Sequence, residues 1–120
     1  MNSPEMNWPE LKWILILAAL SGALAVGAGA FGAHGASGTA AEWLKTGAQY
    51  QLLHAVAALA VLRLEARGPA ILFLAGGAIF AGTLYLMALG LPRWLGAVTP
   101  IGGVLLIAGW LWLAWTAFRR

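Results

Sequence analysis

The chain contains no cysteine and very few charged side chains, and both shortages limit what it can be. Without cysteine there is no disulfide framework, no thiolate metal site and no thiol redox chemistry. Charged residues make up 9% of the 120 positions and hydrophobic residues 62%, whereas soluble domains have about 25% and about 45–50%. Four acids and seven bases could not keep the surface of such a globule in water. We therefore expect a membrane protein.

The charged residues fall outside four apolar stretches, Trp13–Ala33, Thr46–Leu62, Pro69–Leu91 and Ala97–Phe118. A helix needs about 20 residues to cross the hydrocarbon core of a bilayer, and only the second stretch looks short. Thr39 and Glu42 have the spacing of a capping box, which extends that helix back to about residue 40. We expect residues 1–120 to form one transmembrane domain with spans at about 13–33, 40–62, 69–91 and 97–118.

The segments between the spans look short. Pro4 and Pro9 predict an irregular tail over residues 1–10, and residues 63–69 read as a tight charged turn. Pro92 and Arg93 mark an equally short third connection. Short connections make consecutive helices antiparallel neighbours, so the expected fold is all-α, an integral membrane up-down four-helix bundle.

Basic residues predict the orientation of this bundle. With four spans, one face carries both termini and the second connection, with five bases: Lys12, Arg63, Arg67, Arg119 and Arg120. The other face carries only Lys45 and Arg93. The positive-inside rule then places both termini in the cytoplasm, in a multi-pass protein of the inner (plasma) membrane. The net charge of +3 is explained by these loops, and no nucleic-acid partner is expected.

Small residues predict where the helices pack. In lipid, helices associate through close backbone approach, and Ser21, Ala25, Gly29 and Ala33 recur every four residues. Ala78 and Gly82 form a similar notch on the third span, and Gly102-Gly103 opens the fourth. Exposed seams of this kind on the first and third spans favour a homo-oligomer or a larger membrane complex, with lipid as the other partner.

Polar side chains inside the spans are the candidate functional residues, because they are costly at membrane depth. On the second span Tyr50, Gln51 and His54 share one helical face with Gly47, and His54 lies about 10 Å deeper than Gly47. The other candidates lie in the half facing away from the cytoplasm: His34, Thr83, Tyr85 and Thr99. We expect a polar cluster in that outer half.

This cluster allows several interpretations. Its hydrogen bonds could simply hold helices together, or His54 could bind a quinone-like ring, a lipid headgroup or another small molecule. Such a protein would be a non-enzymatic accessory or ligand-binding bundle. The alternative is a membrane redox component, using quinone or haem, or an oligomeric transport component that uses His54.

Catalytic and metal sites are not expected. His34 and His54 are offset by about 10 Å along the membrane normal, too far apart to share a metal, so we expect no metal and no cofactor. Ser21 and Ser37 lack the partners of a nucleophilic triad. Trp110, Trp112 and Trp115 read as an interfacial belt that closes the last span.

Four motifs in order across the chain resemble the domain-of-unknown-function-423 family, which includes animal transmembrane protein 256 and many bacterial inner-membrane proteins. They are Gly29-Ala-Phe-Gly-Ala-His-Gly35, Thr46-Gly-Ala-Gln-Tyr-Gln-Leu-Leu-His-Ala55, Phe80-Ala-Gly-Thr-Leu-Tyr85, and Leu95-Gly-Ala-Val-Thr-Pro-Ile-Gly-Gly103 followed by Ala108-Gly-Trp110. The resemblance implies a small multispanning membrane protein with no settled activity. Its motif positions coincide with the outer-half polar residues and with Pro100, which lies in the same half. The connection between His34 and Tyr50 looks shorter here than in many members.

Overall fold

The computed structural model describes residues 7–120, which are almost entirely helical. Over that range there are four α-helices and one short 3-10 helix, and no strand. The elements are α1 (Trp8–His34), α2 (Gly38–Leu62), α3 (Arg67–Ala88), η1 (Arg93–Ala97) and α4 (Thr99–Arg119). The expectation of an all-α fold with four helices is confirmed.

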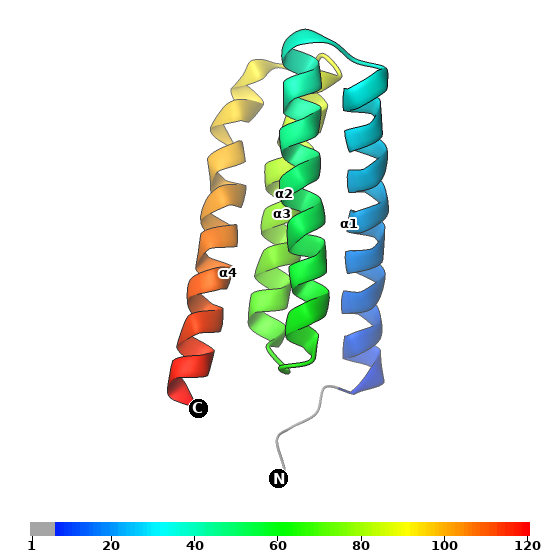
Figure 1. The fold of residues 1–120 in the computed structure, drawn as a ribbon. Coiled ribbons are helices and arrows are strands. Elements are labelled where there is room, and N and C mark those ends of the chain that lie inside the picture. Colours follow the sequence, from blue (N-terminus) through cyan, green and yellow to red (C-terminus); the bar gives the residue numbers. More distant parts are fainter. Residues whose placement is uncertain (1–6) are drawn as a thin grey trace.

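The helices run up and down, with α2 and α3 in the centre (Figure 1). α1 packs mainly against α2, and α4 packs against α3. α1 and α4 therefore lie at opposite flanks of the α2–α3 pair, in a molecule measuring 53 × 24 × 19 Å. We call the end with the start of α1, the end of α4 and residues 63–66 the terminal end, and the end with residues 35–37 and 89–98 the distal end (Figure 1).

Three helical segments in residues 7–120 are long and apolar enough to cross a membrane: Trp8–His34, Arg67–Ala88 and Arg93–Arg119. α2 is not among them, because polar side chains interrupt its apolar sequence. Its 25 residues nevertheless extend about 38 Å and pack between α1 and α3. The polar side chains that lower its hydropathy include the buried Gln51 and His54.

The helix starts differ from the sequence expectations. α1 begins at Trp8 with Asn7 as its N-cap, whose side chain accepts a hydrogen bond from the Glu10 backbone N–H at 3.4 Å. Pro9 is tolerated because the first turn needs no donor at that position, so an irregular tail was the wrong prediction for residues 8–10. The rest of that expected tail, residues 1–6, lies outside the described residues.

The predicted capping box on α2 is also wrong. The helix starts at Gly38 with Ser37 as N-cap, and no side chain caps it. Thr39 is therefore already inside the first turn, where it cannot adopt the extended N-cap conformation that a capping box needs.

The connection after α3 is longer than the sequence suggested. α3 ends at Ala88 because Gly90 adopts the left-handed conformation, with φ of +100°. The Leu91 N–H donates to Leu86 O at 3.0 Å and the Gly90 N–H to Met87 O at 3.0 Å, the pattern of a Schellman motif. Pro92 then leads into η1, so a structured turn replaces the short link expected around Pro92 and Arg93.

Small residues bring α1 and α2 together as expected, but the residues of α1 at the contact are not all the predicted ones. Ala18, Ala25 and Gly32 are buried, and a Cβ at Gly32 would lie 2.9 Å from the Cβ of Leu44. Gly29 packs beside Ala48, whereas Ala33 is exposed. A strict four-residue spacing drifts around a helix of 3.6 residues per turn, so a seven-residue spacing keeps better contact with a neighbouring helix.

The α3–α4 seam uses Gly76 and Gly102. A Cβ on Gly102 would meet the Phe80 backbone N and would lie 2.8 Å from Gly76 O, so the two backbones are in direct contact. The predicted notch at Ala78 and Gly82 is not part of this seam: Ala78 is exposed and Gly82 faces open space. Self-association through these two positions stays a prediction.

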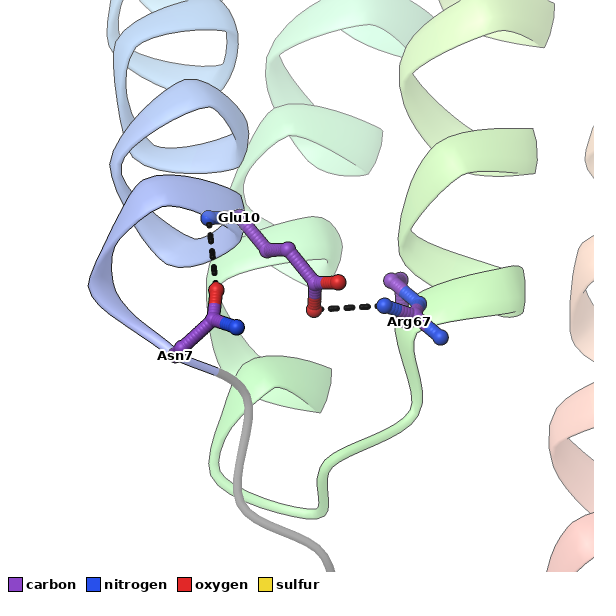
Figure 2. Close-up of polar contacts among 3 residues, drawn as sticks. All are labelled: Asn7, Glu10 and Arg67. Atoms are coloured by element: carbon purple, nitrogen blue, oxygen red, sulfur yellow. Dashed lines mark hydrogen bonds and ion pairs between the residues drawn. The ribbon is translucent and has the colours of Figure 1, made fainter.

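An ion pair connects α1 to α3 at the terminal end. The Glu10 carboxylate lies 2.5 Å from the Arg67 guanidinium, and the same Glu10 residue provides the N–H that Asn7 caps (Figure 2). Both charged side chains are about half exposed, so the pair contributes at most about 1 kcal/mol. Its main effect is to fix where the Arg67 side chain lies.

Candidate functional site

The polar candidates on α2, α3 and α4 lie between the middle of the molecule and its distal end and form three separate contacts. Gln51 pairs with Tyr85, Thr83 pairs with Thr99, and His54 pairs with Trp110. Gln51, His54, Thr83 and Tyr85 are all less than 9% exposed. His34 does not join them, because it lies exposed at the last residue of α1.

The Gln51–Tyr85 contact joins α2 to α3. The Tyr85 hydroxyl donates to Gln51 Oε1 at 2.8 Å, and both side chains are buried. Gly47, one turn before Gln51, makes room for the tyrosine, because a Cβ at Gly47 would lie 2.8 Å from Tyr85 Cε1. The spacing of Gly47 and Gln51 on one helical face thus seats the ring and pairs its hydroxyl.

His54 uses both of its ring nitrogens. Nδ1 lies 2.7 Å from the Tyr50 carbonyl oxygen, which can only accept, so Nδ1 carries the hydrogen. Nε2 is then an acceptor, and it receives the indole N–H of Trp110 at 3.0 Å. The imidazole is therefore neutral and of one tautomer, with no nitrogen free to ligate a metal or a haem iron.

Aromatic rings surround the imidazole. Phe73 is fully buried, with its ring centroid 5.5 Å from that of His54 and 4.6 Å from that of Trp110. This triangle takes one ring from each of α2, α3 and α4, so the His54–Trp110 hydrogen bond lies in an apolar setting.

The position of Trp110 differs from the predicted interfacial belt, because its indole reaches His54 in the middle of the bundle. The available signal was depth, because Trp110 lies ten residues before Arg120, or about 15 Å along the helix axis. That distance is about half the hydrocarbon thickness, too deep for an interfacial tryptophan.

Thr83 and Thr99 connect α3 to α4. Their hydroxyl oxygens are 2.6 Å apart, and Thr83 Oγ1 also lies 3.0 Å from Ile79 O and 3.1 Å from Phe80 O. In one consistent arrangement Thr99 donates to Thr83, and Thr83 donates to its own helix. The pair therefore needs no external partner.

Tyr50 is the most accessible of the central candidates, with 44% of its surface exposed. Its ring stacks on Phe80 at a centroid distance of 4.7 Å and lies nearly parallel to the His54 ring at 6.3 Å. Tyr50 thus lies against the His54 and Phe80 rings while part of its own ring stays exposed.

The cluster is a closed hydrogen-bonded arrangement. Within residues 7–120 no buried side-chain nitrogen or oxygen lacks a partner. The same range contains no group of three His, Cys, Asp or Glu side chains that could hold a metal. The hydrogen bonds of the cluster connect α2, α3 and α4 to one another at mid-depth and in the distal half.

A groove lies beside this cluster, between α2 and α4. Its volume is about 440 Å³, within the usual range of about 300–1,000 Å³ for small-molecule sites. It is lined by Trp43 from α2, Phe80, Leu84 and Met87 from α3, and Gly96, Thr99, Pro100 and Gly103 from η1 and α4. The lining is almost wholly apolar. Arg93 is outside the lining but lies beside it at the distal end, with its guanidinium 5.6 Å from the Trp43 ring centroid.

The family model described as "Protein of unknown function (DUF423)" matches residues 28–103. A UPF0382 membrane protein of Staphylococcus haemolyticus is 38% identical over 120 residues, covering 91% of this chain and 98% of that protein. The UPF0382 inner membrane protein YgdD of Escherichia coli is 41% identical over 119 residues, covering 90% and 91%. No solved structure matches the chain.

Proposed function

The chain belongs to the DUF423 family of membrane proteins of unknown function, and we propose that it is a non-enzymatic, four-span protein that holds a phospholipid acyl chain in the groove between α2 and α4. The family match covers the whole groove lining, from Trp43 to Gly103. The observation that carries the proposal is the apolar groove itself, with a cationic side chain at its membrane-surface edge.

The chemistry of the groove favours a lipid over a polar substrate. Phe80, Leu84 and Met87 form an apolar floor, and the one hydroxyl in the lining, that of Thr99, is already paired with Thr83. An acyl chain needs no hydrogen bond from the protein, whereas a polar substrate would leave its own groups unpaired there. Arg93 lies where the phosphate of such a lipid would reach the membrane surface.

The polar cluster has a supporting role in this proposal. The His54–Trp110 hydrogen bond ties α2 to α4 below the groove, and Thr83–Thr99 ties α3 to α4 within its wall. Together they keep the floor and the two sides at a fixed separation. None of the groups presents a free acid, base or nucleophile to the groove.

The proposed four-span topology counts α2 as a membrane span in addition to the three apolar segments. α2 packs along α1 and α3, both of which could cross a bilayer, and its polar side chains nearest mid-depth, Gln51 and His54, are buried against its neighbours. With four spans both termini share one face, and the five bases on that face, against Lys45 and Arg93 on the other, favour a cytoplasmic location for it.

The test uses a matched pair of glycines. A side chain at Gly103 would enter the groove, and one at Gly82 would enter open space outside it, since neither position has an atom within 4 Å of a built Cβ. Purified wild type, Gly103→Phe and Gly82→Phe are reconstituted with phosphatidylcholine carrying a diazirine in its acyl chain. After illumination the cross-linked peptides are mapped by mass spectrometry.

The wild type and Gly82→Phe should cross-link at Leu84 and Met87 well above the level at Leu111, which is freely exposed. Gly103→Phe should lose the groove cross-links and keep those at Leu111. Equal labelling of the groove and Leu111 in the wild type, or groove labelling unchanged by Gly103→Phe, would mean that only bulk lipid contacts the protein.

A further inference from the structure

A second hollow lies at the terminal end, between the start of α3 and the end of α4. Its volume is about 460 Å³, and the residues that give it its character are Arg67, Trp112, Thr116, Arg119 and Arg120. We call it the basic hollow. It shares no residue with the groove between α2 and α4.

Two of its three arginines are held in place by the rest of the protein. Arg67 pairs with the Glu10 carboxylate on α1 (Figure 2). Arg120 Nη2 donates to Leu64 O at 2.9 Å, in the connection between α2 and α3. A guanidinium carries five N–H donors, so one contact of this kind can hold the side chain without using all of them.

The charge of the hollow is unbalanced. Its lining contains three guanidinium groups and one carboxylate, Glu65, and the Glu10 carboxylate outside it faces Arg67. Like charges brought together repel one another, and an anion between them relieves that repulsion. Planar guanidinium groups bind the oxygens of phosphate in pairs, which makes phosphate the anion they match best.

The other side of the hollow is apolar and, in the four-span topology proposed above, faces the bilayer. The Trp112 ring lies over Gly68, so closely that a Cβ there would overlap the ring. Ile71, half exposed, continues this wall into α3. The hollow therefore has charged groups toward the membrane surface and hydrocarbon groups toward the membrane interior.

We propose that the basic hollow binds the phosphodiester group of an anionic phospholipid, whose acyl chains lie along the Ile71 and Trp112 side. Basic pockets between transmembrane helices recognise anionic headgroups in this way. A free inorganic phosphate would use the arginines alone, whereas a lipid uses both halves of the hollow.

The experiment measures lipid preference at this site by native mass spectrometry. Detergent-solubilised protein is titrated with phosphatidylglycerol or with phosphatidylcholine of the same acyl chains, and the two affinities are compared. The test variant is Arg119→Gln, because Arg119 is exposed, whereas Arg67 and Arg120 also contact α1 and the connection between α2 and α3. The matched control is Arg63→Gln, which removes the same charge at the same end but outside the lining.

We expect the wild type and Arg63→Gln to bind phosphatidylglycerol more tightly than phosphatidylcholine. Arg119→Gln should bind phosphatidylglycerol about fivefold more weakly than the wild type does, because each base near an anionic headgroup contributes about 1 kcal/mol. Arg119→Lys should recover part of the preference. Gly103→Phe should leave the preference unchanged, which separates this site from the groove.

Three outcomes would overturn the proposal. The wild type could show no preference between the two lipids. Arg63→Gln could lose as much affinity as Arg119→Gln, which would indicate diffuse surface charge. Inorganic phosphate at millimolar concentration could displace phosphatidylglycerol fully, which would indicate a soluble-anion site.

Discussion

The indole N–H of Trp110 on α4 donates to Nε2 of His54 on α2 across 3.0 Å, although the two helices are not sequence neighbours. α2 otherwise packs mainly on α1 and α3. Since Nδ1 of the same ring is held by the Tyr50 carbonyl, the imidazole is fixed at both nitrogens. This hydrogen bond is the polar connection between α2 and α4 in the described contacts.

Removing the indole N–H should weaken the protein by a small but measurable amount. Trp110→Phe keeps a ring against Phe73 and removes the donor, so we expect a loss of about 0.6 kcal/mol, and no more than about 1.7 kcal/mol, in free energy of unfolding. Unfolding in mixed detergent micelles measures it. Trp115→Phe, on the exposed surface of α4, is the control and should change little.

The Trp110 effect should depend on His54. In a His54→Ala background Trp110→Phe should have a much smaller effect, because the acceptor is already gone. Additive losses in the double variant would contradict the hydrogen bond as the source of the coupling.

The Gln51–Tyr85 pair should behave as a unit. Tyr85→Phe leaves the buried Gln51 carbonyl oxygen without its donor, and Gln51→Leu leaves the buried tyrosine hydroxyl without its acceptor. Each single variant should lose about 1 kcal/mol of stability. The double variant should lose no more than either one, because no orphaned polar atom remains; the same micelle unfolding assay tests this. A double variant that loses the sum would mean that the two groups act independently.

The sequence predicts a large part of the site because depth and helical face are simple functions of residue number. Gln51 and His54 fall on one face with Gly47, and Thr83, Tyr85 and Thr99 fall at matching depth on other helices. The structure places these residues in contacts between α2, α3 and α4. Which residue pairs with which could not be predicted, because that depends on the rotation of each helix about its axis.

The glycines show the same limit. Small residues at spacings of four indicated helix contact, but Gly82 faces open space while Gly76 and Gly102 bring two backbones together. The positions of small residues in the sequence show where two helices could approach closely. Which of these glycines lies at the contact depends on how α3 packs on α4. The groove and the basic hollow likewise combine residues from separate helices.

Membrane topology can be tested with single cysteines, because the natural chain has none. Ser37→Cys lies before α2 and Leu64→Cys after it, so the pair asks whether α2 crosses the bilayer. We expect an impermeant maleimide to label Ser37→Cys in intact cells, and Leu64→Cys only after permeabilisation. Labelling of both from the same side would contradict a crossing by α2, and the reverse pattern would contradict cytoplasmic termini.

The neighbouring glycines Gly102 and Gly103 provide the sharpest test of the α3–α4 packing. Gly102→Ala places a methyl group against the Phe80 backbone and 2.8 Å from Gly76 O, and neither backbone can move without separating the helices. We expect a loss of about 1–3 kcal/mol in unfolding free energy. Gly103→Ala adds the same methyl group where no atom lies within 4 Å, so stability should be unchanged or higher by up to about 1 kcal/mol, through better helix propensity. Equal effects at the two positions would mean that α3 and α4 do not approach at Gly102.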